Sequence, residues 1–173
     1  CHPVASTHSR AINSGKKLRR FLANLANTEE LGYHTPTCFL GPFMRIISVN
    51  VNGMQAAVER GLLTWLHAQN ADVICLQDTR ISAFELDDPA FQMDGYFLYA
   101  CDAEVPSLGG VALYSRLQPK AIISGLGFES ADRYGRYLQA DFDKVSIACL
   151  LLPSGQQGDE ELNQKFKFMD DFA

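Results

Sequence analysis

The sequence lacks a long hydrophobic run. None of its 173 residues belongs to an uninterrupted apolar stretch of about eighteen residues, the length that a membrane-spanning helix requires. Its five cysteines show no Cys-x-x-Cys pair, and Cys75 and Cys149 lie in apolar, strand-like runs where small buried thiols are usual. We therefore expect no membrane association, no disulfide framework and no metal cluster of cysteines, and we predict a cytoplasmic protein in a reducing environment.

Positive charge is scarce after residue 43. Residues 1–43 carry five Lys or Arg against two Glu, a balance of +3, whereas residues 44–173 carry ten against eighteen acids, a balance of −8. A protein that holds phosphate backbones by itself usually has a basic footprint. The second region lacks that footprint overall, although its composition leaves room for a local basic patch.

The chain changes character at Met44. Residues 1–43 mix Ser, Thr, Asn and His with one amphipathic helical stretch, at about residues 16–31. We predict that they form a poorly structured leader or a non-native extension; their basic, acid-poor composition also fits a transit peptide. Three histidines there have no metal-ligand spacing. The folded domain is expected to cover residues 44–173.

Strands and helices alternate after Met44 and then give way to closely spaced strands. Strands are predicted at 45–50, 71–77, 96–101, 110–115, 121–124, 136–142 and 145–152, and helices at 56–69 and from 159 onward. The predicted buried faces are Leu62, Trp65 and Leu66 in the first helix, and Leu162, Phe166, Met169 and Ala173 in the last. An α/β start followed by an antiparallel meander predicts two mixed, mostly antiparallel sheets packed face to face.

Two of the apolar runs end abruptly in polar side chains. The run at 71–76 leads into Asp78, Thr79 and Arg80, and the run at 44–49 leads into Asn50 and Asn52. Polar groups at the carboxyl ends of two neighbouring strands are a common way to build a site in an α/β sheet. The alternative is structural, with Asp78 as a helix cap and the asparagines as turn residues.

These two stretches resemble the exonuclease III and apurinic endonuclease family of the endonuclease/exonuclease/phosphatase superfamily. The family's first strand ends in Asn-x-Asn-Gly or Asn-x-Asp-Gly, and a later strand carries Leu-Gln-Glu-Thr-Lys; residues 76–80 here read Leu-Gln-Asp-Thr-Arg. The resemblance implies a four-layer α/β-β-α sandwich. It covers residues 44–173 and matches only the first half of the family's domain, so we expect a truncated N-terminal half.

The resemblance also implies metal-dependent phosphodiester hydrolysis, from which this chain departs twice. Asn50 and Asn52 match the family, and Arg136 matches an arginine near the phosphate. Asp78 replaces the metal-binding glutamate and is about 1.5 Å shorter in reach, whereas Mg²⁺ tolerates only about 0.1 Å in its ligand distances. Leu151 replaces a tyrosine. We expect no intact catalytic centre, with Asp78 a metal ligand only if the site is active.

Together these departures resemble a branch of the family without nuclease activity. That likeness implies a non-catalytic post-transcriptional regulator of carbon catabolite repression, which acts with the Sm-like RNA chaperone Hfq on A-rich mRNA sites and needs no cofactor. The alternative is a Mg²⁺-dependent exonuclease III-like AP endonuclease or exodeoxyribonuclease in DNA repair, with DNA as its substrate and Tyr137 as a substitute phenol. A superfamily phosphatase and an inert truncation product also stay open.

An Arg/Tyr cluster lies just before and within the predicted strand at 136–142. It comprises Arg133, Tyr134, Arg136 and Tyr137. Arginine and tyrosine side chains stack on bases and are enriched at protein interfaces, so the cluster is a candidate surface for RNA or for a partner. The plain alternative is a set of strand residues with solvated tips.

Overall fold

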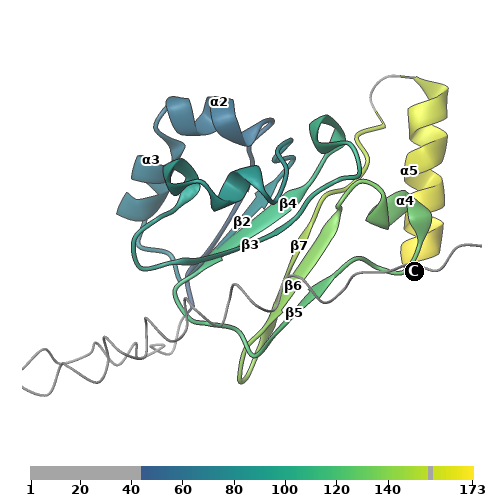
Figure 1. Cartoon of the computed structure of the whole chain (residues 1–173). Helices are drawn as coiled ribbons and strands as arrows, with labels where there is room; N and C mark the ends of the chain where they lie inside the picture. The colour runs from purple at the N-terminus through teal and green to yellow at the C-terminus, as the bar shows by residue number, and fades with distance from the viewer. Residues whose placement is uncertain (1–43, 156–157) are drawn as a thin grey trace, which may run out of the picture. The chain divides into compact units, whose positions relative to one another are not determined.

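The computed structural model describes residues 44–155 and 158–173, which belong to one compact unit (Figure 1). The predicted leader, residues 1–43, lies outside the described residues. The strands are β1 (Ile46–Asn50), β2 (Val73–Gln77), β3 (Phe97–Cys101), β4 (Val111–Ser115), β5 (Ala121–Ser124), β6 (Tyr137–Asp141) and β7 (Ser146–Leu150). The helices are α2 (Met54–Glu59), α3 (Leu62–Ala68), α4 (Glu129–Asp132) and α5 (Asp159–Phe172), with short 3₁₀ turns η1 (Glu85–Asp87), η2 (Pro89–Phe91) and η3 (Pro106–Leu108).

The strands form two sheets, in the order β1-β2-β4-β3 and β5-β6-β7. Only β1 and β2 are parallel, with Asn50 opposite Gln77, and all other pairs are antiparallel. All seven predicted strands are present, each with ends within two residues of the prediction. The predicted α/β architecture with a mixed, mostly antiparallel pair of sheets is therefore confirmed.

The core has two layers because β2 and β4 bury both of their faces. On one face, Ile74 and Leu76 pack beneath α2 and α3 together with Leu66. On the other face, Val73, Cys75 and Leu113 meet side chains of the second sheet, among them Leu138, Ala140, Ile147 and Cys149. A strand covered on both faces reads as a continuous apolar run, which explains the four apolar residues at 73–76.

The predicted helix at 56–69 is two helices, and its predicted buried face is partly wrong. Gly61 takes a left-handed conformation, with φ of 90°, and separates α2 from α3. The turn rotates α3, so that Leu66 is buried as predicted while Trp65 is 51% exposed. Glycine adopts positive φ without a steric penalty, and this one ends the helical periodicity after Arg60.

The predicted buried face of the last helix is also wrong. Leu162, Phe166 and Met169 are exposed, and Phe168 is the buried side chain of α5. Its ring meets that of Phe128 edge to face, with 5.4 Å between centroids. Helix α5 contacts its neighbours through a narrow strip around Phe168, and the wider apolar stripe that the spacing favoured lies outside that strip.

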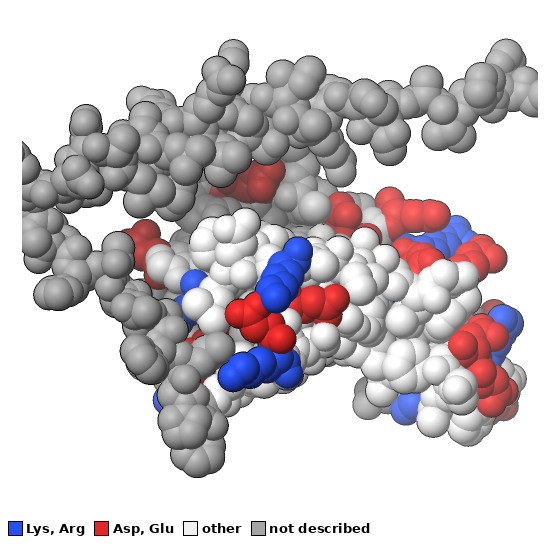
Figure 2. All heavy atoms as spheres, turned by 90° about the horizontal axis from the view of Figure 1, so that it is seen from below, with Lys and Arg blue, Asp and Glu red and all other residues white. Residues whose placement is uncertain are grey.

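Lysine and arginine are scattered over the described surface rather than gathered on it. On the face in Figure 2 most of the surface is white, and most of the blue side chains lie beside red ones. Several of these cations form ion pairs, including Lys120 with Asp143 and Lys167 with Asp171. No helix in the described part of the chain is long and apolar enough to cross a membrane.

Candidate functional site

The ends of β1 and β2 bring the predicted polar residues together. Beyond the strands the two segments stay side by side, because the backbone N–H of Gly53 donates to the carbonyl of Asp78 at 2.9 Å and that of Met54 donates to Thr79 at 2.7 Å. Asn50, Asn52 and Asp78 therefore lie at one edge of the first sheet. This is the arrangement that the two polar strand ends predicted.

The backbone of this edge is unusual for residues other than glycine. Asn52, Asp78 and Arg80 have φ of 49°, 59° and 52°, all in the left-handed region. Asn and Asp tolerate this conformation better than most residues, and such positions cluster at functional loops. The side chain of Asn50 also accepts a hydrogen bond from the backbone N–H of Asn52 at 3.1 Å, so this asparagine does act as a turn residue.

The carboxylate of Asp78 is held by its neighbour Arg80 and does not cap a helix. The Nε of Arg80 donates to Oδ1 at 3.0 Å and a terminal nitrogen donates to Oδ2 at 2.9 Å. Both carboxylate oxygens are thus engaged by one guanidinium, a strong two-point geometry. In the sequence Arg80 stands out only as the last residue of the motif, and this pairing was not predicted.

These residues do not fit a magnesium ion as they stand. Mg²⁺ prefers carboxylate oxygens in octahedral geometry, and the carboxylate at this edge already accepts two hydrogen bonds from a cation. Among residues 44–155 and 158–173, no group of three or more His, Cys, Asp or Glu side chains is placed to hold a metal. Asp78 would have to leave Arg80 before it could serve as a ligand.

Arg136 lies before β6 and is fixed by two carbonyl groups. Its Nε donates to Ser130 and a terminal nitrogen donates to Leu151, both at 3.2 Å, while its guanidinium stacks over the ring of Tyr134 at 4.7 Å. Burial lowers the pKa of Arg136, and interactions with Tyr134 and Asp78 oppose that shift.

Leu151 contributes only its backbone to this arrangement. Its N–H donates to the carbonyl of Arg136 at 2.8 Å, and its own carbonyl accepts from the Arg136 guanidinium. Its side chain packs against the core between the sheets. The substitute phenol suggested by the sequence, Tyr137, donates its hydroxyl proton to Gln139 on the same strand. Neither residue presents a free hydroxyl to Asp78.

Three members of the Arg/Tyr cluster, Arg133, Tyr134 and Arg136, line one hollow of ≈350 Å³ beside α5, and Tyr137 is not among its lining residues. Tyr134 stacks with Arg136, whereas Arg133 is exposed and pairs with Glu104 at 3.4 Å. Tyr137 points along β6 to Gln139, as described above. Tyr134 and Arg136 also line a second hollow, which includes Arg80.

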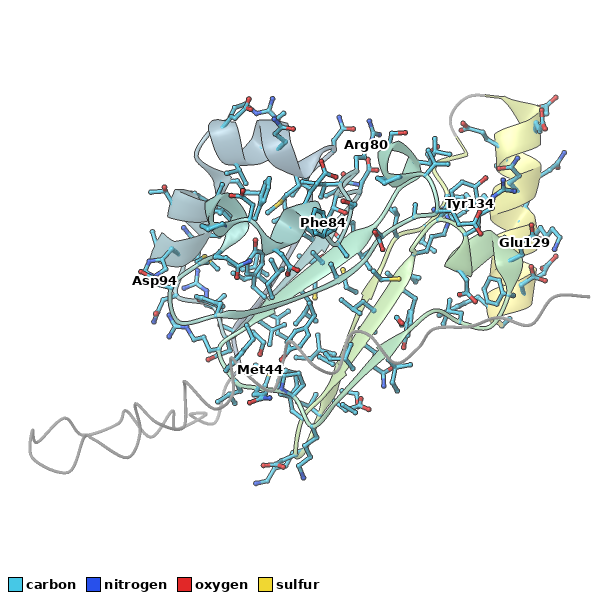
Figure 3. The ribbon with its side chains drawn as sticks, viewed as in Figure 1. Met44, Arg80, Phe84, Asp94, Glu129 and Tyr134 are labelled. Carbon is cyan, nitrogen blue, oxygen red and sulfur yellow. The ribbon has the colours of Figure 1, made fainter. Side chains whose placement is uncertain are left out.

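The second hollow, of ≈480 Å³, opens beside these residues. Arg80, Tyr134 and Arg136 line it, together with Ser154, Gln164 and the acidic Glu161. Figure 3 labels Arg80 and Tyr134, which lie toward the same end of the two sheets. An anionic group such as a phosphate would have to compete with Asp78 for Arg80, and the ring of Tyr134 already has the Arg136 guanidinium over one face.

Glycines allow the segments around the hollow to approach closely. A Cβ on Gly109 would lie 2.5 Å from the carbonyl oxygen of Tyr134, and one on Gly110 would lie 2.5 Å from the hydroxyl of Thr79. The backbone N–H of Gly110 donates to Tyr134 at 3.0 Å, and that of Thr79 donates to Gly110 at 3.1 Å. This role of the two glycines was not predicted, although two glycines directly before an apolar strand are a signal of close backbone approach.

Comparison with known proteins gives the family. The model of the endonuclease/exonuclease/phosphatase family matches residues 47–162. An exodeoxyribonuclease of Bacillus subtilis (strain 168) is 31% identical over 126 residues, which cover 72% of this chain and 49% of the relative. A DNA-(apurinic or apyrimidinic site) endonuclease of Dictyostelium discoideum is 28% identical over 73% of this chain and 35% of its own length.

Solved structures agree on the fold. An AP endonuclease from Archaeoglobus fulgidus superposes with a TM-score of 0.65 at 21% identity, over 75% of this chain and 49% of that one. A 3'-5' exonuclease from Neisseria meningitidis superposes with a TM-score of 0.63 at 23% identity, over 75% of this chain and 50% of that one. The chain belongs to the endonuclease/exonuclease/phosphatase family, and it spans about half the length, or less, of these relatives.

Proposed function

We propose that the protein containing this chain is a non-catalytic member of the family, similar to the catabolite repression control protein. In this proposal it represses translation of catabolic genes by joining the RNA chaperone Hfq on A-rich mRNA sites. One observation carries the loss of catalysis: both oxygens of the Asp78 carboxylate are engaged by Arg80. A carboxylate whose two oxygens already accept hydrogen bonds from a guanidinium is a poor ligand for Mg²⁺.

The sequence around the site supports the proposal. The likeness to the catabolite repression control protein rests on residues 76–80, 110–115, 131–137 and 150–155, which read Leu-Gln-Asp-Thr-Arg, Gly-Val-Ala-Leu-Tyr-Ser, Ala-Asp-Arg-Tyr-Gly-Arg-Tyr and Leu-Leu-Leu-Pro-Ser-Gly. The last of these segments puts Leu151 where active relatives have tyrosine. The first of these segments holds the other departure, Asp78, where the family has glutamate.

The charge distribution also supports a protein that depends on a partner to bind RNA. Residues 44–173 have a balance of −8, and the cations on the face in Figure 2 are scattered. Affinity for a phosphate backbone grows with the number of cations that neutralise it. An RNA chaperone in the same assembly would supply most of that affinity, while Arg80, Tyr134 and Arg136 would add local contacts.

The second candidate is a Mg²⁺-dependent nuclease of DNA repair, and the names of the relatives favour it. The Bacillus subtilis relative is an exodeoxyribonuclease and the Dictyostelium discoideum relative is an AP endonuclease. In this alternative, Asp78 would exchange Arg80 for a metal ion and Arg136 would contact the phosphate. The relatives thus favour the nuclease, whereas the contacts of Asp78 and Leu151 favour the regulator.

The decisive experiment is incision of a duplex that carries an abasic site, with Mg²⁺, by the protein that contains this chain. We expect no metal-dependent incision above the buffer control. Asp78→Glu and Leu151→Tyr, alone and combined, are compared with Asp94→Glu and Leu152→Tyr, which change exposed residues in the same chemical way. If the protein is a working nuclease with a relaxed site, the incision rate of every variant should stay within about tenfold of that of the unaltered protein. Robust Mg²⁺-dependent incision by the unaltered protein would overturn the proposal.

The regulatory part has its own test. An A-rich RNA and a scrambled RNA of equal length are mixed with Hfq, with and without the protein, and the complexes are separated by gel shift. We expect a slower ternary complex on the A-rich RNA only. If the protein neither slows nor stabilises the chaperone–RNA complex, the regulatory assignment fails whatever the nuclease assay shows.

A further inference from the structure

Another concave surface shares no lining residue with the hollow that Arg80, Tyr134 and Arg136 line. It is a groove of ≈660 Å³ between α2 and the segment that carries η1 and η2. Val58, Ile81 and Phe91 give it an apolar lining, and Phe84 and several acidic side chains complete its wall. We call it the acidic groove. The proposed function makes no use of it.

Phe84 is the most unusual residue of the acidic groove. Its side chain is 84% exposed, more than any other large apolar residue in the described part of the chain. Figure 3 labels it on the segment that follows β2. A largely exposed phenyl ring beside a groove with apolar walls is typical of an aromatic anchor at a protein interface.

Hydrogen bonds within the chain fix the backbone around Phe84. The hydroxyl of Ser82 donates to a carboxylate oxygen of Glu85 at 2.6 Å, and the backbone N–H of Ala83 donates to the carboxylate of Asp102 at 2.9 Å. Phe84 therefore sits on a fixed turn. Binding to a turn that is already ordered loses less conformational entropy than binding to a loose loop.

Four carboxylates surround the apolar lining: Glu59, Glu85, Asp87 and Asp88. No Lys or Arg is among the described residues that line the groove, and no ion pair within the described chain involves these four acids. The hydrogen bonds from Ser82 lower the pKa of Glu85. The groove therefore presents uncompensated negative charge around an apolar lining.

We propose that the acidic groove binds a basic segment of a partner protein, in which Lys or Arg residues flank an apolar side chain. The apolar side chain packs on Phe84 and Ile81, and the cations meet the surrounding carboxylates. A cation over the exposed face of Phe84 gains a further cation–π contact. Nucleic acid is the wrong occupant, because four carboxylates repel a phosphate backbone. The inference holds for a regulator and for a nuclease alike.

The probe is a fluorescein-labelled peptide, Gly-Lys-Lys-Leu-Lys-Phe-Lys-Gly, with a matched peptide in which Glu replaces each Lys. Fluorescence anisotropy measures binding to the protein at low and at high salt. We expect the basic peptide to bind with a dissociation constant below about 1 mM, to weaken with salt as exposed charge pairs do, and the acidic peptide not to bind.

Matched variants locate the binding. Phe84→Ser should raise the dissociation constant of the basic peptide by about tenfold or more, because it removes the aromatic anchor. Asp87→Lys should raise it by about fivefold, because it replaces a carboxylate of the groove with a cation. Trp65→Ser and Asp94→Lys change an exposed aromatic residue and an exposed acid outside the groove. Their dissociation constants for the basic peptide should stay within about twofold of that of the unaltered protein. Asp94 lies well apart from Phe84 in Figure 3.

Three outcomes would overturn this inference. The first is no binding of the basic peptide, and the second is equal weakening by groove and control variants. The third is displacement of the peptide by an A-rich RNA whose own binding depends on Phe84, which would make the groove a nucleic-acid surface. None of these outcomes bears on the incision assay, so failure of the groove and failure of the proposed function are distinguishable.

Discussion

Asp78 and Arg80 form a two-point ion pair across a single intervening residue, with donor–acceptor distances of 3.0 and 2.9 Å. Both have left-handed backbone conformations, which turn their side chains toward each other. The pair is local, and Arg80 is about half exposed. Its effect is therefore expected on the chemistry of the carboxylate more than on the stability of the fold.

Replacing Arg80→Gln should release the Asp78 carboxylate at little cost in stability. Partly exposed ion pairs contribute about 1 kcal/mol or less, so we expect the free energy of unfolding to fall by no more than that. Urea unfolding measures it, with Arg60→Gln as the control because Arg60 is exposed and has no ion pair among the described residues. A loss above about 2 kcal/mol would mean that the pair holds the loop itself.

Gly135 tests the close approach of segments next to Arg136. It has φ of 55°, and a Cβ there would lie 2.5 Å from the carbonyl carbon of Asp102. Gly95 has φ of 80° with no atom within 4 Å of the same position. Gly135→Ala should therefore cost about 3 kcal/mol or more of unfolding free energy, and Gly95→Ala about 1 kcal/mol from backbone strain alone. Equal losses of unfolding free energy in the two variants would show that the atoms around Gly135 shift to accommodate the Cβ without an energetic penalty.

The buried hydroxyl of Tyr114 gives a prediction about alkaline pH. It donates to the carbonyl of Phe91 at 2.6 Å, and burial raises the pKa of Tyr114 well above its ordinary value. The folded protein thus holds this proton where the unfolded chain, with a tyrosine pKa of about 10, begins to lose it. The contribution is fully present below about pH 10 and is lost as the pH rises further.

Tyr114→Phe should separate this effect from other alkaline losses. At pH 7 the variant should lose about 1–3 kcal/mol, because the carbonyl of Phe91 is left without its donor. Between pH 9 and pH 11 the unaltered protein should lose about 1.4 kcal/mol more than the variant does. Tyr99 and Tyr137, whose pKa values burial also raises, titrate in both proteins and cancel. Parallel pH curves would show that Tyr114 titrates alike in both states.

The sheets and one edge of the site could be predicted from local patterns. Apolar runs that end at Asn50 and Asp78 locate both the strands and the edge where their polar residues meet, because parallel neighbours place their carboxyl ends together. The features that were predicted wrongly or not at all depend on single backbone angles. The break between α2 and α3 arises from the positive φ of Gly61, and the Asp78–Arg80 pair depends on two more residues with positive φ.

The partners of Arg136 were beyond the sequence for a different reason. Its guanidinium is fixed by the carbonyls of Ser130 and Leu151, and any residue type can supply a carbonyl. No residue pattern encodes such a contact; it appears only when α4 and the end of β7 meet in the fold. The motif located Arg136, and the tertiary structure decided what it binds.

Phe168 and Phe166 offer the sharpest test of how α5 is attached. Both are phenylalanines on the same helix, yet Phe168 is fully buried and Phe166 is 54% exposed. The ring of Phe168 meets Phe128 edge to face, stacks with Phe172 at 6.0 Å and lies 5.9 Å below the Arg136 guanidinium. Phe168→Ala should therefore cost about 3–5 kcal/mol, whereas Phe166→Ala should cost about 0.5 kcal/mol or less.

The cost should also be local, which distinguishes a docking residue from a general core residue. Among the described residues, Phe168 is the buried side chain through which α5 packs, so its loss should free the helix before it unfolds the sheets. Hydrogen exchange of backbone amides measures this: we expect faster exchange throughout α5 in Phe168→Ala and unchanged exchange in β2 and β4. Uniformly faster exchange in helix and sheets would mean that α5 and the sheets unfold as one unit. Faster exchange throughout α5 in Phe166→Ala would mean that Phe166 lies on the packed face of the helix, as the sequence predicted.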